Sequence, residues 1–163
     1  MTLRLGLFLL LLCGLGACGF QLRGSNLETL QHSQVYVQSN GASALAREVK
    51  IQLQNADVIP VNSVTDAKYI INLSNESFER RILSVSPQTG KVEEYEIAYS
   101  ANVSITGPNG DTILKSEPIT AFRDFTFDES AVLGKFEEEQ VLHNDIVRHA
   151  ASNVLRRLQA VAK

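Results

Sequence analysis

Residues 95–105 read Tyr-Glu-Ile-Ala-Tyr-Ser-Ala-Asn-Val-Ser-Ile, and this stretch decides the fold. Its odd-numbered positions are all apolar or aromatic, whereas its even-numbered positions are mostly polar or small. Successive side chains of a β-strand point to opposite faces of a sheet, so a period of two predicts a strand with one apolar face. The opposite face, with Ser100, Asn102 and Ser104, is polar and made of small side chains. We therefore expect a sheet that is buried on one side only.

Two turn sequences flank this strand. Pro-Gln-Thr-Gly precedes it at residues 87–90, and Gly-Pro-Asn-Gly follows it at residues 107–110. Proline presets φ and glycine accepts positive φ, so both stretches predict tight connections between antiparallel strands. In the upstream strand the apolar parity changes within residues 75–81, which predicts a bulge or a strong bend. The downstream strand, residues 113–127, contains Pro118, which favours a sheet edge or a bulge.

The remaining elements are a short strand and two helices. Residues 34–39 have the pattern of a strand, and residues 58–61, interrupted by proline, are either an extended connection or an edge strand. Apolar residues recur every four positions between Ser43, a candidate N-cap, and about Asn55, which predicts an amphipathic helix. A second, longer helix is predicted over residues 130–162.

These elements predict an α+β fold. Both helices must bury an apolar stripe, and the sheet offers one apolar face. We therefore expect a two-layer sandwich, with two helices packed on one face of a mostly antiparallel four-stranded sheet. The second face of the sheet has no predicted cover.

The amino-terminal segment has the pattern of an export signal. Arg4 precedes the apolar run at residues 5–12, which is shorter than the roughly 20 residues that a spanning helix needs. The run leads into Leu15-Gly16-Ala17-Cys18, which resembles the bacterial lipobox. The alternatives are a plain signal peptide or an uncleaved anchor, in both of which Cys18 is incidental.

The lipobox reading divides the chain into three parts. Residues 1–17 are a cleaved lipoprotein signal peptide, residues 18–24 are an acylated anchor and tether, and residues 25–163 are the α+β domain. Acyl chains on Cys18 would hold the protein at a membrane surface. Gly19 follows in place of Asp, which in the usual lipoprotein sorting pattern directs a protein to the outer membrane. The expected location is the periplasmic face of the outer membrane.

Charge and cysteine content exclude several classes of protein. The net charge is −3, which argues against nucleic-acid binding by bulk charge. Cys13 and Cys18 are the two cysteines of the chain, and neither leaves a free thiol if the lipobox reading holds. The fold must then be stable without disulfides or cysteine-bound metal.

The sequence contains no arrangement of residues that is typical of catalysis. His143 and His149 are six residues apart on the predicted helix, so they lie on different faces and cannot chelate a metal together. Three glutamates at residues 137–139 lie near the helix start and are interpreted as a solvated face. There is no nucleophile elbow, phosphate loop or dinucleotide fingerprint. We predict a protein that is not an enzyme and uses no metal and no cofactor.

Three basic residues are candidates for contact with an anionic ligand. Lys91 follows the first turn, Lys135 lies at the start of the last helix, and Arg123 has the parity of the core-facing positions of its strand. A hairpin tip and a helix start can lie at the same end of a two-layer fold, so the three cations could converge. The alternative is that they are scattered solubilising charges.

Several motifs together resemble the LPS-assembly lipoprotein LptE family. They are Cys-Gly-Phe-Gln-Leu-Arg at residues 18–23, Phe-Arg-Asp-Phe at residues 122–125 and Leu-Arg-Arg-Leu at residues 155–158, in this order along the chain. The resemblance implies a two-helix, four-stranded α+β domain anchored in the outer membrane. It also implies that the domain plugs the LptD β-barrel, assists its assembly and contacts lipopolysaccharide.

The resemblance also suggests ligand-contact positions. Family proposals place lipopolysaccharide contacts on basic residues at the hairpin turn and at the start of the last helix, which correspond here to Lys91 and Lys135. The turn at residues 87–91 does not match the family letter for letter. Arg123 joins the candidate lipopolysaccharide-binding residues because of its expected position.

Two other functions stay open at this point. The chain could be a lipoprotein binding module of another envelope complex, or a periplasmic carrier of a small ligand. A closed apolar cavity would favour the carrier, whereas a polar, exposed sheet face would favour the plug.

Overall fold

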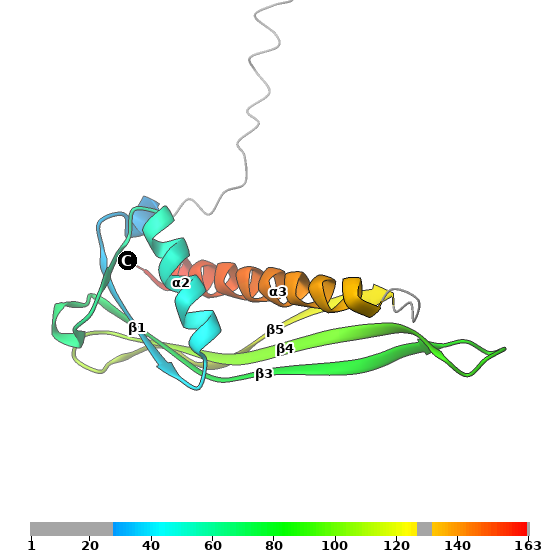
Figure 1. Ribbon diagram of the computed structural model, residues 1–163. Helices are drawn as coiled ribbons and strands as arrows, with labels where there is room; N and C mark the ends of the chain where they lie inside the picture. Colours follow the sequence, from blue (N-terminus) through cyan, green and yellow to red (C-terminus); the bar gives the residue numbers. More distant parts are fainter. Residues whose placement is uncertain (1–27, 127–131, 163) are drawn as a thin grey trace, which may run out of the picture.

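The computed structural model describes residues 28–126 and 132–162. The predicted signal, Cys18 and the tether lie outside these described residues. The elements follow one another as η2 (Glu28–Leu30), β1 (Gln34–Asn40), α2 (Ser43–Asn55), β2 (Ile59–Val61), η3 (Val64–Asp66), β3 (Tyr69–Val85), β4 (Val92–Thr106), β5 (Thr112–Thr126) and α3 (Val132–Val161). Figure 1 shows α2 and α3 on the same side of one sheet, with the β3–β4 hairpin extending past the start of α3.

The sheet is mixed. It has five strands in the order β2-β1-β3-β4-β5, with β1 parallel to both β2 and β3, and β3, β4 and β5 antiparallel to one another. The α+β sandwich with two helices on one face is confirmed. The expectation of a mostly antiparallel four-stranded sheet was wrong in detail, because α2 returns the chain to the same end of the sheet and so makes β1 and β2 a parallel pair.

Prolines mark the two edges of the sheet. Pro60 lies in β2 opposite Val35, and Pro118 lies in β5 opposite Asn102. Proline has no N–H to donate to a ladder, so it is tolerated on edge strands. The expected edge position of the strand that contains Pro118 is therefore confirmed. Of the two interpretations of residues 58–61, the edge strand is correct, and it supplies the fifth strand.

The core lies between the sheet and the two helices. Ile97, Tyr99, Ala101, Val103 and Ile105 of β4 are at most 2 % exposed, which confirms the strand predicted from their period of two. The helices cover them with Leu45, Val49 and Leu53 from α2 and with Ile146, Ala150, Val154 and Leu158 from α3. Each large apolar side chain buried in this way contributes about 1.5–3 kcal/mol.

A bulge in β3 changes which residues face the helices. The register against β4 shifts between Ser74 and Ser77, and Asn75 takes a positive φ of 55°. Asparagine adopts this left-handed conformation more readily than most residues. Before the bulge, odd-numbered residues such as Leu73 face the helices, and after it even-numbered residues such as Phe78 do. The bulge expected within residues 75–81 is confirmed.

The bulge brings the side chain of Glu76 to the start of α2. Its carboxylate accepts hydrogen bonds from the backbone N–H groups of Ala44 and Leu45, each at 3.1 Å. The first N–H groups of a helix have no acceptor within the helix, and the helix dipole favours a negative charge there. The prediction that Ser43 caps this helix was wrong, because Ala42 occupies the N-cap position without a side-chain cap and Glu76 supplies the acceptor from β3.

Tyr99 of β4 completes this contact. Its hydroxyl donates a hydrogen bond to Glu76 Oε1 at 2.9 Å. Burial, together with the nearby Glu76 charge and the hydrogen bond to it, raises the pKa of Tyr99 far above the ordinary tyrosine value. The hydroxyl therefore stays protonated and remains a donor. One carboxylate thus joins α2, β3 and β4.

We expect Glu76→Ala to lower the free energy of unfolding by about 2 kcal/mol, because it leaves two helix N–H groups and the Tyr99 hydroxyl without their acceptor. Urea denaturation followed by circular dichroism measures the change. Glu79→Ala, on the exposed face of the same strand, is the matched control and should have a much smaller effect. Equal losses in the two variants would contradict the role of Glu76.

Candidate functional site

The sheet face that points away from α2 and α3, called the open face here, is polar. The strand registers place on it Ser74, Ser77, Glu79 and Arg81 of β3, Glu94, Glu96, Ser100, Asn102 and Ser104 of β4, and Thr120 and Asp124 of β5. These side chains are exposed or partly exposed. The expectation of a hydrophilic uncovered face, built largely of small side chains, is confirmed.

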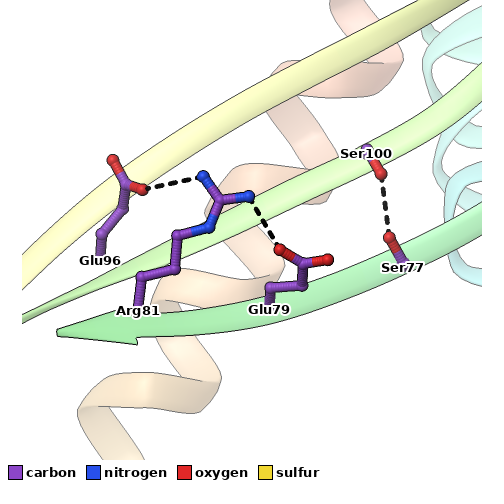
Figure 2. Close-up of polar contacts among 5 residues, drawn as sticks. All are labelled: Ser77, Glu79, Arg81, Glu96 and Ser100. Carbon is purple, nitrogen blue, oxygen red and sulfur yellow. Dashed lines mark hydrogen bonds and ion pairs between the residues drawn. The ribbon is translucent and has the colours of Figure 1, made fainter.

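Contacts between strands organise the open face. Figure 2 shows Ser77 and Ser100 facing each other across the β3–β4 pair, with 2.9 Å between their hydroxyl oxygens. Arg81 lies between two carboxylates, 2.8 Å from Glu79 and 3.7 Å from Glu96. The hydrogen bond to Glu79 and the charges of both glutamates raise the pKa of Arg81. The face is therefore a polar surface on which Arg81 offsets part of the negative charge of the glutamates.

Phe122 interrupts this polar surface. It lies on β5 opposite Ala98 and is 47 % exposed. The sequence pattern gave a signal for it, because Phe122 has the parity opposite to that of the buried Phe125. A single exposed apolar residue is common on protein surfaces, so Phe122 does not by itself define a contact site.

The tip of the β3–β4 hairpin combines aliphatic side chains with a cation. Ile82, Leu83 and Val85 are 59 %, 48 % and 52 % exposed, respectively. The predicted turn is present: Ser86 N–H donates to the Lys91 carbonyl at 2.7 Å, and Gly90 has a φ of 69°. Lys91 is exposed at the end of this turn. Sequence reasoning did not single out these three aliphatic residues. They lie near the end of the β3–β4 hairpin, which extends past the start of α3 (Figure 1).

Arg123 faces the helices, as its parity predicted, and it contacts an anion. Its Nε and Nη2 each lie 2.8 Å from Asp145 Oδ2 on α3, and its Nη1 donates to the Phe122 carbonyl at 2.8 Å. Arg123 therefore links β5 to α3.

The predicted convergence of the basic residues is not what the strand register shows. Arg123 lies opposite Ile97 of β4, and six residues separate Ile97 from Lys91, a span of about 20 Å along an extended strand. Lys135 lies in the first turn of α3, at the same end of the molecule as the hairpin (Figure 1). Its side chain lies outside the described part of the structure. The structure therefore does not bring Lys91 and Arg123 together.

The first half of α3 packs on β3 and β4 through aromatic and ionic contacts. His143 stacks on Phe78, with ring centroids 4.4 Å apart, and its Nε2 lies 3.7 Å from Glu139. Arg80 lies over the Tyr95 ring at 4.9 Å and 3.8 Å from Glu139. One sequence interpretation changes as a result: Glu139 is an ion-pair partner and not simply part of a solvated face.

The described ranges, 28–126 and 132–162, contain no group of three histidine, cysteine, aspartate or glutamate side chains arranged to hold a metal ion. In the same part of the chain, no helix is both long and apolar enough to cross a membrane. Helices cover one sheet face, the other face is polar and exposed, and a hairpin projects from one end. These features define a two-layer α+β domain whose exposed surfaces are a polar sheet face and a projecting hairpin.

Comparison with known proteins identifies the family. A family model described as LptE, lipopolysaccharide-assembly, matches residues 33–158, and the chain belongs to this family. It therefore has a role in lipopolysaccharide assembly. LptE is a non-enzymatic lipoprotein associated with the outer membrane of the envelope, so this chain is not an enzyme. The resemblance inferred from the sequence motifs is confirmed.

Individual relatives agree with this assignment. The LPS-assembly lipoprotein LptE of Pectobacterium atrosepticum is 29 % identical over 162 residues, which cover 98 % of this chain and 85 % of that protein. The solution structure of an uncharacterized lipoprotein B from Nitrosomonas europaea has a TM-score of 0.73 at 25 % identity and covers 87 % of this chain and 91 % of its own. The crystal structure of the rare lipoprotein B from Shewanella oneidensis has a TM-score of 0.67 at 27 % identity. The match covers 78 % of this chain and 95 % of that chain.

A double-mutant cycle tests the link between β5 and α3. We expect Arg123→Ala and Asp145→Ala to show a coupling free energy of about 0.5–1 kcal/mol in urea denaturation, because two guanidinium nitrogens contact one carboxylate oxygen at the rim of the core. The matched control is the Arg81–Glu79 pair, which is exposed on the open face and should couple more weakly. A coupling at residues 123 and 145 no larger than that of the control would contradict the structural role of Arg123.

Proposed function

We propose that this chain is a lipid-anchored subunit of the outer-membrane lipopolysaccharide translocon. In this proposal it plugs an LptD-type β-barrel, assists the assembly of that barrel and binds lipopolysaccharide during insertion into the outer leaflet. Family membership supports the setting. The lipobox Leu15-Gly16-Ala17-Cys18, followed by Gly19, supports acylation at Cys18 and attachment to the periplasmic face of the outer membrane.

The observation that carries the plug proposal is the open face. The lumen of a large transmembrane barrel is polar and filled with water, so a plug should present hydrophilic groups to the wall. The Ser77–Ser100 hydrogen bond and the Arg81 contacts with Glu79 and Glu96 provide such a surface. An apolar sheet face would have to be covered by lipid or by another apolar protein surface.

The hairpin tip supports contact with lipopolysaccharide. Lipid A carries phosphates and acyl chains, and Lys91 lies near Val85 on a hairpin that also exposes Ile82 and Leu83. A lysine supplies a point charge for a phosphate, while the aliphatic groups provide apolar surface for acyl chains. Lys135 is proposed as a second contact on the basis of the family resemblance. Arg123 is proposed as a third, and there a phosphate would share the guanidinium with Asp145.

Purification through a carboxy-terminal tag tests the complex. We expect the full chain, extracted from outer membranes in mild detergent, to bring down a large β-barrel, and mass spectrometry to find acyl chains on Cys18. Ser100→Arg places a long charged side chain in the middle of the open face and should reduce barrel recovery at least about fivefold, because interfaces are as closely packed as protein interiors. Lys115→Glu, which changes the charge of an exposed β5 residue elsewhere, is the control. Absence of the barrel from the wild-type sample would overturn the proposal.

Charge reversal tests the ligand contact. We expect Lys135→Glu to reduce lipopolysaccharide capture by the purified chain about tenfold, because it replaces attraction for the lipid A phosphates with repulsion. Thermal unfolding should stay close to that of the wild type. Lys115→Glu makes the same charge change on β5 and should bind normally. Unchanged lipopolysaccharide capture by Lys135→Glu would remove this residue from the site.

A further inference from the structure

A groove lies between the last turns of α3 and the middle of β5. Its volume is about 340 Å³, near the lower end of the roughly 300–1,000 Å³ that is typical of ligand sites. The residues that line it are Pro118, Ile119 and Thr120 of β5 and Asn153, Arg156, Arg157 and Ala160 of α3. The two arginines belong to the motif at residues 155–158, to which the proposed function gives no role.

Arg157 has an unused donor in this groove. Its Nη2 donates to the Pro118 carbonyl at 3.1 Å, and its Nε lies 3.6 Å from a Glu117 carboxylate oxygen. Its Nη1 is buried and has no hydrogen-bond partner within the described residues. Buried polar atoms in folded proteins are nearly always hydrogen-bonded, so Arg157 keeps a donor that it can offer to an oxygen in the groove when its side chain turns outward.

The chemistry of the lining favours a phosphate. Arg156 is exposed, donates a hydrogen bond to Asn153 Oδ1 and lines the same groove as Arg157. The two guanidinium groups carry two positive charges, whereas the Glu117 carboxylate carries one negative charge, so the groove has a net positive charge. Planar guanidinium groups bind phosphate oxygens through paired hydrogen bonds, and both Arg156 and Arg157 line the groove.

We propose that this groove binds a phosphate group, and that its source is the headgroup of an anionic phospholipid in the leaflet that holds the lipid anchor. The choice of source rests on the proposed anchor at Cys18. Ten residues separate Cys18 from Glu28, which span at most about 35 Å. Figure 1 shows η2, where the described chain begins, at the same end of the molecule as the last turns of α3. The proposed anchor would therefore keep this end of the molecule within that distance of the membrane surface.

The groove is separate from the proposed lipopolysaccharide contacts at Lys135 and Lys91. Arg157 follows Lys135 by 22 residues on α3, which corresponds to about 33 Å along the helix. The hairpin tip with Lys91 also lies at the opposite end of the molecule from the last turns of α3 (Figure 1). The two sites can therefore be tested independently.

Native mass spectrometry of the full chain in detergent tests the groove. The probes are dihexanoyl phosphatidylglycerol, the zwitterionic dihexanoyl phosphatidylcholine and inorganic phosphate. We expect the wild type to bind the anionic lipid, and R156Q/R157Q to bind it at least about tenfold more weakly because both guanidinium groups are lost. R157K, which keeps the charge but loses the planar fork, should bind with intermediate affinity. R148Q removes an exposed arginine on the opposite side of α3 and is the matched control, expected to bind like the wild type.

The outcomes separate the source of the phosphate from the site itself. Binding of inorganic phosphate but not of the lipid, lost in R156Q/R157Q, would support the phosphate site and assign it to free phosphate. Equal binding of both lipids, or undiminished binding in R156Q/R157Q, would overturn the proposal. If the double variant unfolds, R156Q alone decides, because Arg156 is exposed and its replacement spares the fold. Barrel recovery and lipopolysaccharide capture should be unchanged in these variants, so failure here is distinguishable from failure of the proposed function.

Discussion

The carboxylate of Glu76 joins the two layers of the molecule at one point, and the arrangement of the rest depends on it. It accepts hydrogen bonds from two backbone N–H groups at the start of α2 and from the hydroxyl of Tyr99 in β4. Glu76 can reach them because the bulge at Asn75 turns its side chain toward the helices. Without the bulge, the alternation set by Leu73 would direct Glu76 to the open face, and the helix start would lose its acceptor.

The same bulge lets one long strand pack against two helices and still present a polar face. Before it, β3 contributes Leu73 to the core, and after it Phe78 stacks on His143 of α3. The shift by one residue also places Ser77 and Arg81 on the open face. A continuous alternation would have exposed Phe78 and Ile82 there instead. The hydrophilic character of the proposed docking surface is therefore a consequence of backbone geometry as much as of composition.

The sequence predicted what local periodicity encodes and missed what depends on distant contacts. The alternation at residues 95–105, the two turns and the parity change before residue 81 gave the three antiparallel strands and the bulge correctly. Strand β2 has three residues, one of them Pro60, which is too short for a period to be visible. The Ser43 cap was a plausible local signal, but Glu76, more than thirty residues away, takes that role. No local sequence pattern predicts that a glutamate so distant along the chain accepts hydrogen bonds from the start of this helix.

In the candidate site, too, local periodicity predicted some features, whereas others depend on contacts between distant residues. The polar open face followed from alternation, whereas the Asp145 partner of Arg123 and the Pro118 contact of Arg157 join elements that are far apart in the sequence. Parity alone required Arg123 to meet an anion or reach the rim of the core, and it could not say which. The sequence identified Arg156 and Arg157 only as part of a family motif. It could not predict the groove, because the groove forms only when α3 packs on β5.

The length of the molecule suits a protein that acts away from its anchor. The 30 residues of α3 span about 45 Å, and the 15 residues of β4 span about 50 Å. Both exceed the roughly 30 Å thickness of a bilayer's hydrocarbon core. In the proposed function, a domain held at its η2 end by the periplasmic leaflet can therefore carry the hairpin tip and Lys91 well into a barrel lumen. A compact domain with short strands could not contact the periplasmic leaflet at one end and a ligand deep in the lumen at the other.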